Sequence, residues 1–239
     1  MWNCIGNVFS RKNRGRPPIH EPRHVFEALM YIARTGCQWR LLPDCYPSWK
    51  TVYWHFTRWA TSGKIDVVMD RLRRFCRKSV GKDYRSTIGI IDSQSVKTTR
   101  CAAAKGYDGN KKVKGRKRHL LVDSLGLLIS VVVTRANVHD LKGGRCLVHQ
   151  IQDSAALSRV RQIYADSAYV SLEQEGIPVE IAKNLTKKFN PLPQRWKAER
   201  SIAWLSKYRR TSIDYERYCF YSEAWVKLAC IGVAGNRIK

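Results

Sequence analysis

The sequence predicts a mixed α/β domain that follows a small helical domain, and three patterns along the chain support this prediction. From residue 22 to residue 80, apolar residues recur at helical spacing. Short runs of β-branched and apolar residues follow from residue 87 to residue 134, and helix and strand patterns then alternate. Strands followed by alternating helices and strands are typical of a mixed sheet. The 239 residues, 44% of them hydrophobic, are enough for two such domains.

Residues 1–21 are expected to form a basic arm. The stretch from Met1 to Ser10 does not have the pattern of a helix, and the arginine-rich residues after it include two consecutive prolines. Because proline fixes an extended backbone, Arg14 and Arg16 are candidates for contacts with DNA phosphates or with a minor groove. A plain disordered tail is the alternative interpretation of the same residues.

Residues 22–80 are expected to form three helices. The first carries an apolar face and ends near Gly36, the second begins after Pro47 and ends near Gly63, and the third covers 64–77 with arginines opposite its apolar stripe. Three short helices with basic faces are typical of a helix-turn-helix-like DNA-binding domain. We assign the tryptophans of this region to its core, since such rings pack more often than they stack on bases: Trp39, Trp49, Trp54 and Trp59.

Residues 81–239 are expected to form the α/β domain. A linker at 82–85 leads to a strand at 87–91, which ends at Asp92. The turn at 123–126 separates two apolar runs, at 118–122 and 127–134, and this predicts a β-hairpin. The predicted elements after the hairpin are a helix at 141–157, strands at 160–164 and 178–182, and a last helix at 195–208.

The charge of the chain points to a nucleic-acid partner. The 44 Lys and Arg residues exceed the 19 Asp and Glu residues, which gives a formal net charge of +25. A compact chain with this excess would repel itself unless a polyanion neutralised it. A membrane surface also attracts cations, but no apolar run approaches the roughly 20 residues of a spanning helix. We therefore predict a DNA-binding protein without a membrane partner.

Cysteine spacing and the first residues bear on zinc and on location. Eight cysteines are scattered along the chain, and none forms the two-residue spacing of a zinc knuckle, so no zinc site is predicted. We interpret the thiols as small buried hydrophobic groups in a reducing compartment. Residues 1–14 lack the apolar core of a signal peptide, and we expect a cytoplasmic, nucleoid-associated protein.

Three acidic residues form the candidate catalytic site. Asp92 and Asp166 each close a short apolar run, and ligand sites of α/β sheets collect beyond the carboxyl ends of strands. Two acids placed together there would repel each other unless a divalent cation lay between them, and Mg²⁺ prefers such oxygen ligands. Glu199, among basic residues on the last predicted helix, is the candidate third ligand. Taken singly, each acid is also explained as a turn cap or as part of a surface ion pair.

Several stretches together resemble one known family. They are IIDSQSVK at 90–97, GYD at 106–108, KKVKGRKRH at 111–119 and WKAERSIAWL at 196–205, and the resemblance runs from about Arg14 to the C-terminus. On these residues the chain resembles the DDE transposases of bacterial insertion sequences, of the IS-five family. The stretch TGCQWRLLP at 35–43 resembles part of the small N-terminal domain of that family.

The resemblance implies a fold, a metal site and a substrate. It implies a ribonuclease-H-like catalytic fold in which Asp92, Asp166 and Glu199 occupy the positions of the metal-binding triad. The implied cofactor is a pair of Mg²⁺ ions, with Mn²⁺ as an alternative, and the implied substrate is the inverted repeats of the element. Relatives usually have an extra N-terminal helix, which is not expected at Met1 to Ser10, and this suggests a shortened copy.

Basic residues near the acids are the candidate DNA contacts. The run 111–118 leads from the first acid into a predicted core strand and is interpreted as a grip on phosphates, with a solvated loop as the alternative. In the family signature an arginine precedes the glutamate by four positions, which fits Arg195, and a lysine follows it by seven, whereas Lys207 is one position further on. With Arg14 and Arg16 of the arm, the full set comprises Lys97, Lys111, Lys112, Lys114, Arg116, Lys117, Arg118, Arg195, Arg200 and Lys207.

These observations lead to three hypotheses of function. The first is a transposase that cuts DNA at the ends of its element with Mg²⁺ and joins the freed 3′ hydroxyl to target DNA, as a homodimer or higher oligomer on double-stranded DNA. The second is a truncated, non-catalytic DNA-binding protein that represses transposition. A ribonuclease H or Holliday-junction nuclease is the third, but it leaves the N-terminal helices without a role.

Overall fold

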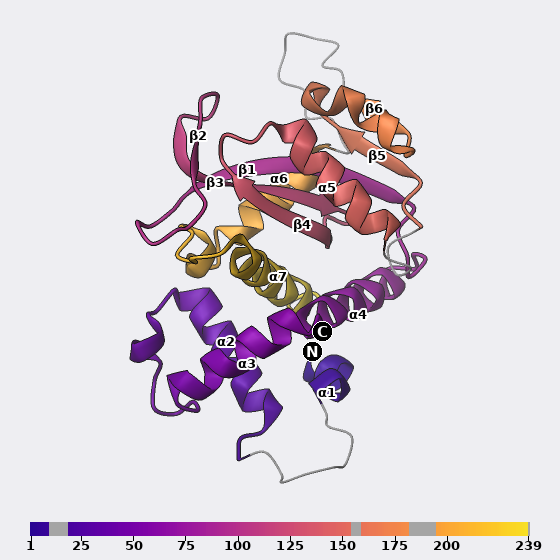
Figure 1. Cartoon of the computed structure of the whole chain (residues 1–239). Helices are drawn as coiled ribbons and strands as arrows, with labels where there is room; N and C mark the ends of the chain where they lie inside the picture. Colours follow the sequence, from indigo (N-terminus) through magenta and orange to yellow (C-terminus); the bar gives the residue numbers. More distant parts are fainter. Residues whose placement is uncertain (10–18, 154–158, 182–194, 239) are drawn as a thin grey trace.

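The computed structural model describes residues 1–9, 19–153, 159–181 and 195–238 (Figure 1). Four helices come first: α1 (Trp2–Phe9), α2 (Pro22–Thr35), α3 (Trp49–Thr61) and α4 (Lys64–Ser79). The last three correspond to the three helices predicted from apolar spacing. Arg14 and Arg16, the expected contacts of the basic arm, lie outside the described residues. Among the described helices, none combines the length and the apolar character that a membrane span requires.

The prediction that Met1 to Ser10 forms no helix was wrong. Residues 2–9 form α1, which packs against α4 and α2. Its Trp2 and Phe9 rings stack with centroids 5.7 Å apart, and Ile5 is fully buried. An eight-residue helix with Asn3, Gly6 and Asn7 has weak intrinsic propensity, so contacts with the rest of the chain stabilise it.

The sheet contains six strands in a mixed arrangement. They are β1 (Ile88–Lys97), β2 (Gly106–Asp108), β3 (Val113–Val122), β4 (Leu128–Arg135), β5 (Gln162–Ala165) and β6 (Val179–Ile181). The order is β2-β3-β1-β5-β6. β2 and β4 both pair with the edge of β3 that faces away from β1: β2 with the first residues of β3, and β4 with the residues after them. β3 is antiparallel to both β1 and β4, whereas β5 and β6 run parallel to β1. An antiparallel half joined to a parallel half through the first strand is the ribonuclease-H-like arrangement, and the predicted fold class is confirmed.

Helices cover both faces of the sheet. One face packs against α5 (Asp140–Gln152) and the 3-10 helix η2 (Ser167–Glu175), and Ile91, Leu121 and Ile163 are buried there. The other face packs against α6 (Arg195–Leu205), α7 (Cys219–Gly235) and α4. Ile90 and Val122 are buried on that second face. Because neighbouring residues of a strand point to opposite faces, this division assigns a face to each residue of β1.

The C-terminal helix α7 joins the helical part of the chain to the sheet. It packs against α2, α3 and α4 as well as β4, and Figure 1 shows it between the sheet and the helices α2 and α3. The Trp225 ring of α7 stacks on Phe56 of α3 with centroids 4.7 Å apart. One apolar core therefore extends across the expected boundary between residues 80 and 81. This helix was not predicted, because a helix that is apolar on nearly every side lacks the periodicity that reveals a half-buried one.

Two arginines of α4 point inward rather than toward solvent. The Arg77 Nη1 atom donates to Asp123 Oδ2 at 2.9 Å, and Arg73 Nη1 donates to the Leu128 carbonyl at 3.0 Å. Asp123 is fully buried, and its other oxygen accepts the backbone N–H groups of Leu125 and Leu127. The expectation that the arginines of this helix all lie on its outer face was wrong for these two. They attach the helix to the turn between β3 and β4.

The tryptophan and cysteine assignments hold only in part. Trp59 is buried, but Trp54 is 50% exposed and its ring lies 5.0 Å from the Arg58 guanidinium. Among the cysteines, Cys76 is buried, whereas Cys45, Cys101 and Cys146 are exposed. Apolar character alone therefore does not place these side chains in the core.

Candidate active site

Asp92 and Asp166 lie on neighbouring parallel strands. β1 pairs with β5 in the register Ile88↔Gln162, Gly89↔Ile163 and Ile90↔Tyr164. The same register two residues further brings Asp92 opposite Asp166, and neighbouring strands are about 4.8 Å apart. The predicted strand end at residue 91 was wrong, because β1 continues through Asp92 to Lys97 to pair with β3.

Both aspartates are directed to the same face of the sheet. Ile90 is buried on the face of α6, so alternation along β1 directs Asp92 to that face as well. Tyr164 packs on the same face, and the extended backbone of Asp166 (φ −84°, ψ 177°) continues the alternation of β5. Asp166 also caps η2, since its Oδ1 accepts the Ala168 N–H at 3.0 Å. Asp92 Oδ1 accepts the N–H of Ser93 at 2.7 Å.

Glu199 lies on α6, which packs against β1 and β3 on the face of the two aspartates. Ala198 and Ser201 on either side of it are buried, and Ser201 Oγ donates to the Gly126 carbonyl at 2.7 Å. These contacts fix the helix while the Glu199 side chain is exposed. Within the described residues, no group of three His, Cys, Asp or Glu side chains is arranged to hold a metal ion. The fold thus brings the two aspartates together, with the glutamate on their face of the sheet but not clustered with them.

The chemistry of the donors fits a hard divalent cation. Carboxylate oxygens are the ligands that Mg²⁺ selects, and it usually keeps several waters besides one or two protein carboxylates. Two carboxylates on adjacent parallel strands supply such a pair, and a third on α6 lies on the same face. The positions of Asp92 and Asp166 therefore suit a metal ion that also contacts a substrate phosphate.

A buried tyrosine that the sequence reading missed lies behind the two aspartates. Tyr169 is 1% exposed, and its pKa is raised by burial and by the carboxylates of Asp140, Asp92 and Asp166. A Cβ on Gly144 would approach the Tyr169 ring to 2.8 Å, so α5 lies directly on this ring. The signal in the sequence was the position of Tyr169 three residues after Asp166. A single aromatic residue there is also what an ordinary core requires.

A buried histidine also packs against α5. His119 pairs with Ser93 in the register of β3 and β1, and burial lowers its pKa to about 4. Its Nε2 lies 3.0 Å from Thr134 Oγ1, and a Cβ on Gly143 would meet its ring at 2.3 Å. His119 is therefore a neutral packing group beneath α5.

Three exposed lysines lie at the hairpin of β2 and β3: Lys111, Lys112 and Lys114. The Lys111 Nζ atom donates to the carbonyl of Ser93 at 2.7 Å and lies 3.1 Å from its Oγ. Because Ser93 follows Asp92, this lysine reaches the strand that carries the first candidate acid. Positive charge thus lies beside the strand that carries Asp92.

The other three basic residues of the same run are interior, and their assignment as phosphate contacts was wrong. Arg116 is fully buried, and Lys117 and Arg118 are 6% and 2% exposed. The Arg116 guanidinium lies 3.2 Å from both Asp214 carboxylate oxygens and donates to Ser222 Oγ at 2.8 Å. A side chain with its donors occupied inside the protein is not accessible to a DNA backbone.

Lys117 and Arg118 have internal partners of the same kind. The Lys117 Nζ atom lies 3.2 Å from Asp108 Oδ2 and 3.1 Å from Asp140 Oδ1. Although burial opposes it, hydrogen bonds from Ser95, the Lys111 N–H and Lys117 hold the pKa of Asp108 at about 2. Arg118 donates to the Thr211 carbonyl at 2.7 Å, and its pKa is lowered to about 10 by burial.

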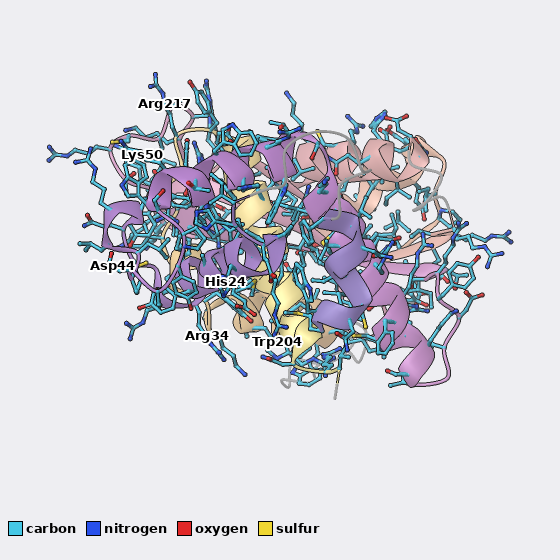
Figure 2. The ribbon with its side chains drawn as sticks, turned by 90° about the horizontal axis from the view of Figure 1, so that it is seen from below. His24, Arg34, Asp44, Lys50, Trp204 and Arg217 are labelled. Atoms are coloured by element: carbon cyan, nitrogen blue, oxygen red, sulfur yellow. The ribbon has the colours of Figure 1, made fainter. Side chains whose placement is uncertain are left out.

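The remaining basic candidates occupy three different environments. Arg200 lies between the rings of Trp196 and Trp204, 4.6 Å and 4.7 Å away, and donates to the Leu125 carbonyl at 3.1 Å. Lys207 lines a cavity of about 200 Å³ with Arg34, Trp204 and Arg237. Figure 2 shows two of these residues, Arg34 and Trp204, near each other. Lys97 is exposed at the end of β1. Arg195 is the first residue of α6, and its side chain lies outside the described part.

Comparisons with known proteins match both parts of the chain. A family model described as "Putative transposase of IS4/5 family" matches residues 1–69, and one described as "Transposase DDE domain" matches residues 83–231. A protein of Burkholderia cepacia named "Putative transposase for insertion sequence element IS402" is 33% identical over 137 residues. That match covers 52% of this chain and 65% of the length of the relative.

Solved structures of a transposase are also similar to this chain. A "Mos1 transposase paired-end complex with left transposon end" is 16% identical with a TM-score of 0.31, and the match covers 95% of this chain and 82% of that chain. A "Crystal structure of the Mos1 Strand Transfer Complex" is 17% identical with a TM-score of 0.25, with the same two coverages.

Proposed function

Since the chain belongs to the family of transposases with a DDE domain, we propose that it binds the inverted repeats of its own insertion sequence and cuts and joins DNA strands there with Mg²⁺. The observation that carries this proposal is the register of β1 and β5. It brings Asp92 opposite Asp166 on the face of the sheet that α6 covers. Parallel strands from separate parts of the chain thus place two carboxylates together.

Asp92 and Asp166 are proposed to supply oxygen ligands to the metal site, and Glu199 to complete it. When bound, two Mg²⁺ ions activate the attacking oxygen and stabilise the leaving oxygen of an in-line displacement at phosphorus. The exposed hairpin lysines Lys111, Lys112 and Lys114 hold the flanking phosphates.

The proposed reaction has two steps on DNA. In the first, water attacks a phosphodiester at the end of the element, the P–O bond to the 3′ oxygen breaks, and a 3′ hydroxyl is released. In the second, this 3′ hydroxyl attacks a phosphodiester of the target, so that one P–O bond forms and another breaks. Neither step needs an oxidant or a high-energy cofactor.

The experiment that tests the proposal uses the full chain and a labelled duplex that carries the DNA flanking its gene. With Mg²⁺, we expect a cut at the end of the repeat that leaves a 3′ hydroxyl, followed by a product joined to a second duplex. A protein that binds the repeat and leaves it intact would instead be a DNA-binding repressor. Cutting of every duplex without joining would identify a nuclease. Either result would overturn the proposal.

A further inference from the structure

Four cations surround one tyrosine ring in the segment between α4 and β1. The guanidinium carbons of Arg74, Arg85 and Arg159 lie 5.6, 5.4 and 6.0 Å from the centroid of the Tyr84 ring, and Lys78 Nζ lies at 5.8 Å. Arg74 and Lys78 come from α4, whereas Arg85 and Arg159 precede the parallel strands β1 and β5. Three separate segments thus direct positive charge to one place.

A groove opens beside this ring. It has a volume of about 510 Å³ and is lined by residues of α1, α4 and the linker: Cys4, Arg71, Arg74, Phe75, Lys78 and Tyr84. Phe75 is 43% exposed within it. We call this feature the Tyr84 groove, and we include in it Arg85 and Arg159, which contact the same ring.

The carboxylates near the groove do not balance its cations. Asp70 pairs with Arg74 at 2.7 Å and also with Arg73, and Asp83 pairs with Arg159 at 3.2 Å. Within the described part of the chain, Lys78 and Arg85 have no carboxylate at ion-pair distance. The Nε atoms of Arg74 and Arg85 are buried, and no described residue offers them a hydrogen-bond acceptor.

Such a cluster of like charges requires an anion. Groups that each lie within 6.0 Å of one centroid are no more than twice that distance apart. That separation is close to the Debye length of about 10 Å at 0.1 M salt, so the cations repel one another appreciably. A chain of phosphates would relieve this repulsion through charge-assisted hydrogen bonds to the exposed cations, Lys78 and Arg159.

The Tyr84 groove lies before the first residues of β1 and β5, whereas the candidate active site lies in the middle of β1 and just after β5. Arg85 lies before the start of β1, and Asp92 is four residues after the first residue of that strand. At about 3.3 Å per residue, these four residues span roughly 13 Å along the sheet. DNA bound in the groove would therefore be a different stretch of backbone from the one that meets Asp92 and Asp166.

We propose that the Tyr84 groove is a second binding surface for the phosphate backbone of duplex DNA, separate from the lysines of the β2–β3 hairpin. This inference rests on the proposed function, because it takes DNA as the partner. Phosphates along one strand are evenly spaced acceptors, which suits cations presented by three segments around one ring. The contacts are to the backbone, so the surface binds any sequence.

The test compares two double variants of the full chain. Lys78→Ala with Arg159→Ala removes two cations of the groove, and Lys50→Ala with Arg217→Ala removes two exposed cations elsewhere. Lys50 and Arg217 are exposed, and Figure 2 shows both near one edge of the molecule. Fluorescence anisotropy with a labelled 30-base-pair duplex in chelator measures binding without cutting. Thermal unfolding of all proteins checks that they fold.

We expect the groove variant to bind about tenfold more weakly at 0.1 M salt. Its slope of log affinity against log salt should fall by about 2, since each lost phosphate contact changes it by about 0.9. The control variant should keep the slope of the wild type. If the two variants have the same affinity and salt slope, the Tyr84 groove is not a DNA-binding surface. This result would not bear on cleavage by the wild type. A wild type that binds the duplex but never cuts it would contradict the proposed function instead, and one that binds no duplex would contradict both.

Discussion

Ile90 of β1 pairs with Tyr164 of β5 in parallel register, and both side chains pack on the face of the sheet that α6 covers. This pair sets the geometry of the candidate site, because two residues further along each strand come Asp92 and Asp166. Residues 90 and 164 are far apart in sequence, so the site depends on the pairing of two distant strands. Changes that shift this pairing by one residue would move one aspartate to the opposite face.

The buried ion pair of Arg116 and Asp214 is expected to be a major stabilising contact. Replacing Arg116 by Met leaves the Asp214 carboxylate buried without its cation, and the free energy of unfolding should fall by about 3–5 kcal/mol. Lys114→Met, on the exposed side of the same strand, should change it by less than about 0.5 kcal/mol. Denaturant unfolding measures both. Equal stability of the two variants would mean that Arg116 is not the internal residue described above.

The stability of the fold is expected to depend on pH through Glu223 of α7. Its Oε1 accepts the Val133 N–H at 2.9 Å, and burial raises its pKa from 4.5 to about 7. The folded state thus favours the protonated carboxyl. Its contribution is fully present below pH 4.5 and is lost as the pH rises to about 7, because the unfolded chain releases this proton first.

Glu223→Gln keeps an acceptor for Val133 and removes the titration. Relative to the wild type, this variant should gain about 3 kcal/mol in unfolding free energy between pH 4.5 and pH 8, since each pKa unit corresponds to about 1.4 kcal/mol. Urea unfolding of both proteins at the two pH values gives this difference. The contributions of the other titrating groups are the same in both proteins and therefore cancel. A difference that is the same at both pH values would contradict the raised pKa.

A chain that begins at Gly81 is expected not to fold. Sequence patterns suggested that the α/β part is independent, but α7 packs against α2, α3 and α4, and Trp225 lies against Phe56 and Trp39. Removal of the helices exposes this apolar surface to water. We expect the shortened chain to aggregate or to lack a cooperative thermal transition. A soluble chain with a sharp transition would show that the two parts are independent domains.

The sequence predicted the strands and helices with clear periodicity and missed those without it. The hairpin around residues 123–126 and the helix α5 were expected, because turn residues and apolar spacing mark them. The helix α7 has apolar residues on nearly all sides and therefore no pattern to detect. α1 is too short and too poor in helix-forming residues to be recognised without the chain that packs on it.

The candidate site was predicted in part for the same reason. Asp92 and Asp166 follow apolar runs, and this local signal placed both in the sheet. The burial of Arg116, Lys117 and Arg118 depends on β1 and β4 pairing with both edges of β3, and on helices covering its faces. A run of basic residues in the sequence does not contain that information, so the whole run was interpreted as an exposed grip on DNA phosphates. Tyr169 was missed because its neighbours come from α5 and β1.

The hairpin lysines are expected to contribute to DNA binding without sequence preference. Replacing Lys111, Lys112 and Lys114 by Ala should lower the salt slope of binding by about 2 to 3, at roughly 0.9 per phosphate contact. Affinity for repeat and random duplexes should fall by the same factor, because phosphate contacts carry no base information. Anisotropy titrations at several salt concentrations measure this, with Lys50→Ala and Arg217→Ala as the control. An unchanged slope would show that these lysines do not contact DNA phosphates.

Cleavage by single-residue variants tests the account most directly. Asp92→Asn, Asp166→Asn and Glu199→Gln are compared with Asp44→Asn, an exposed acid in the helical part, on a labelled repeat duplex with Mg²⁺. Under the proposed function, bound metal ions would supply several kcal/mol of transition-state stabilisation, and each 1.36 kcal/mol is tenfold in rate. We predict that each of the first three variants cuts about 10³-fold more slowly or not at all, while it binds DNA like the wild type and Asp44→Asn cuts normally. Cutting at the wild-type rate by Asp92→Asn or Asp166→Asn would contradict the assignment of this pair as the metal site.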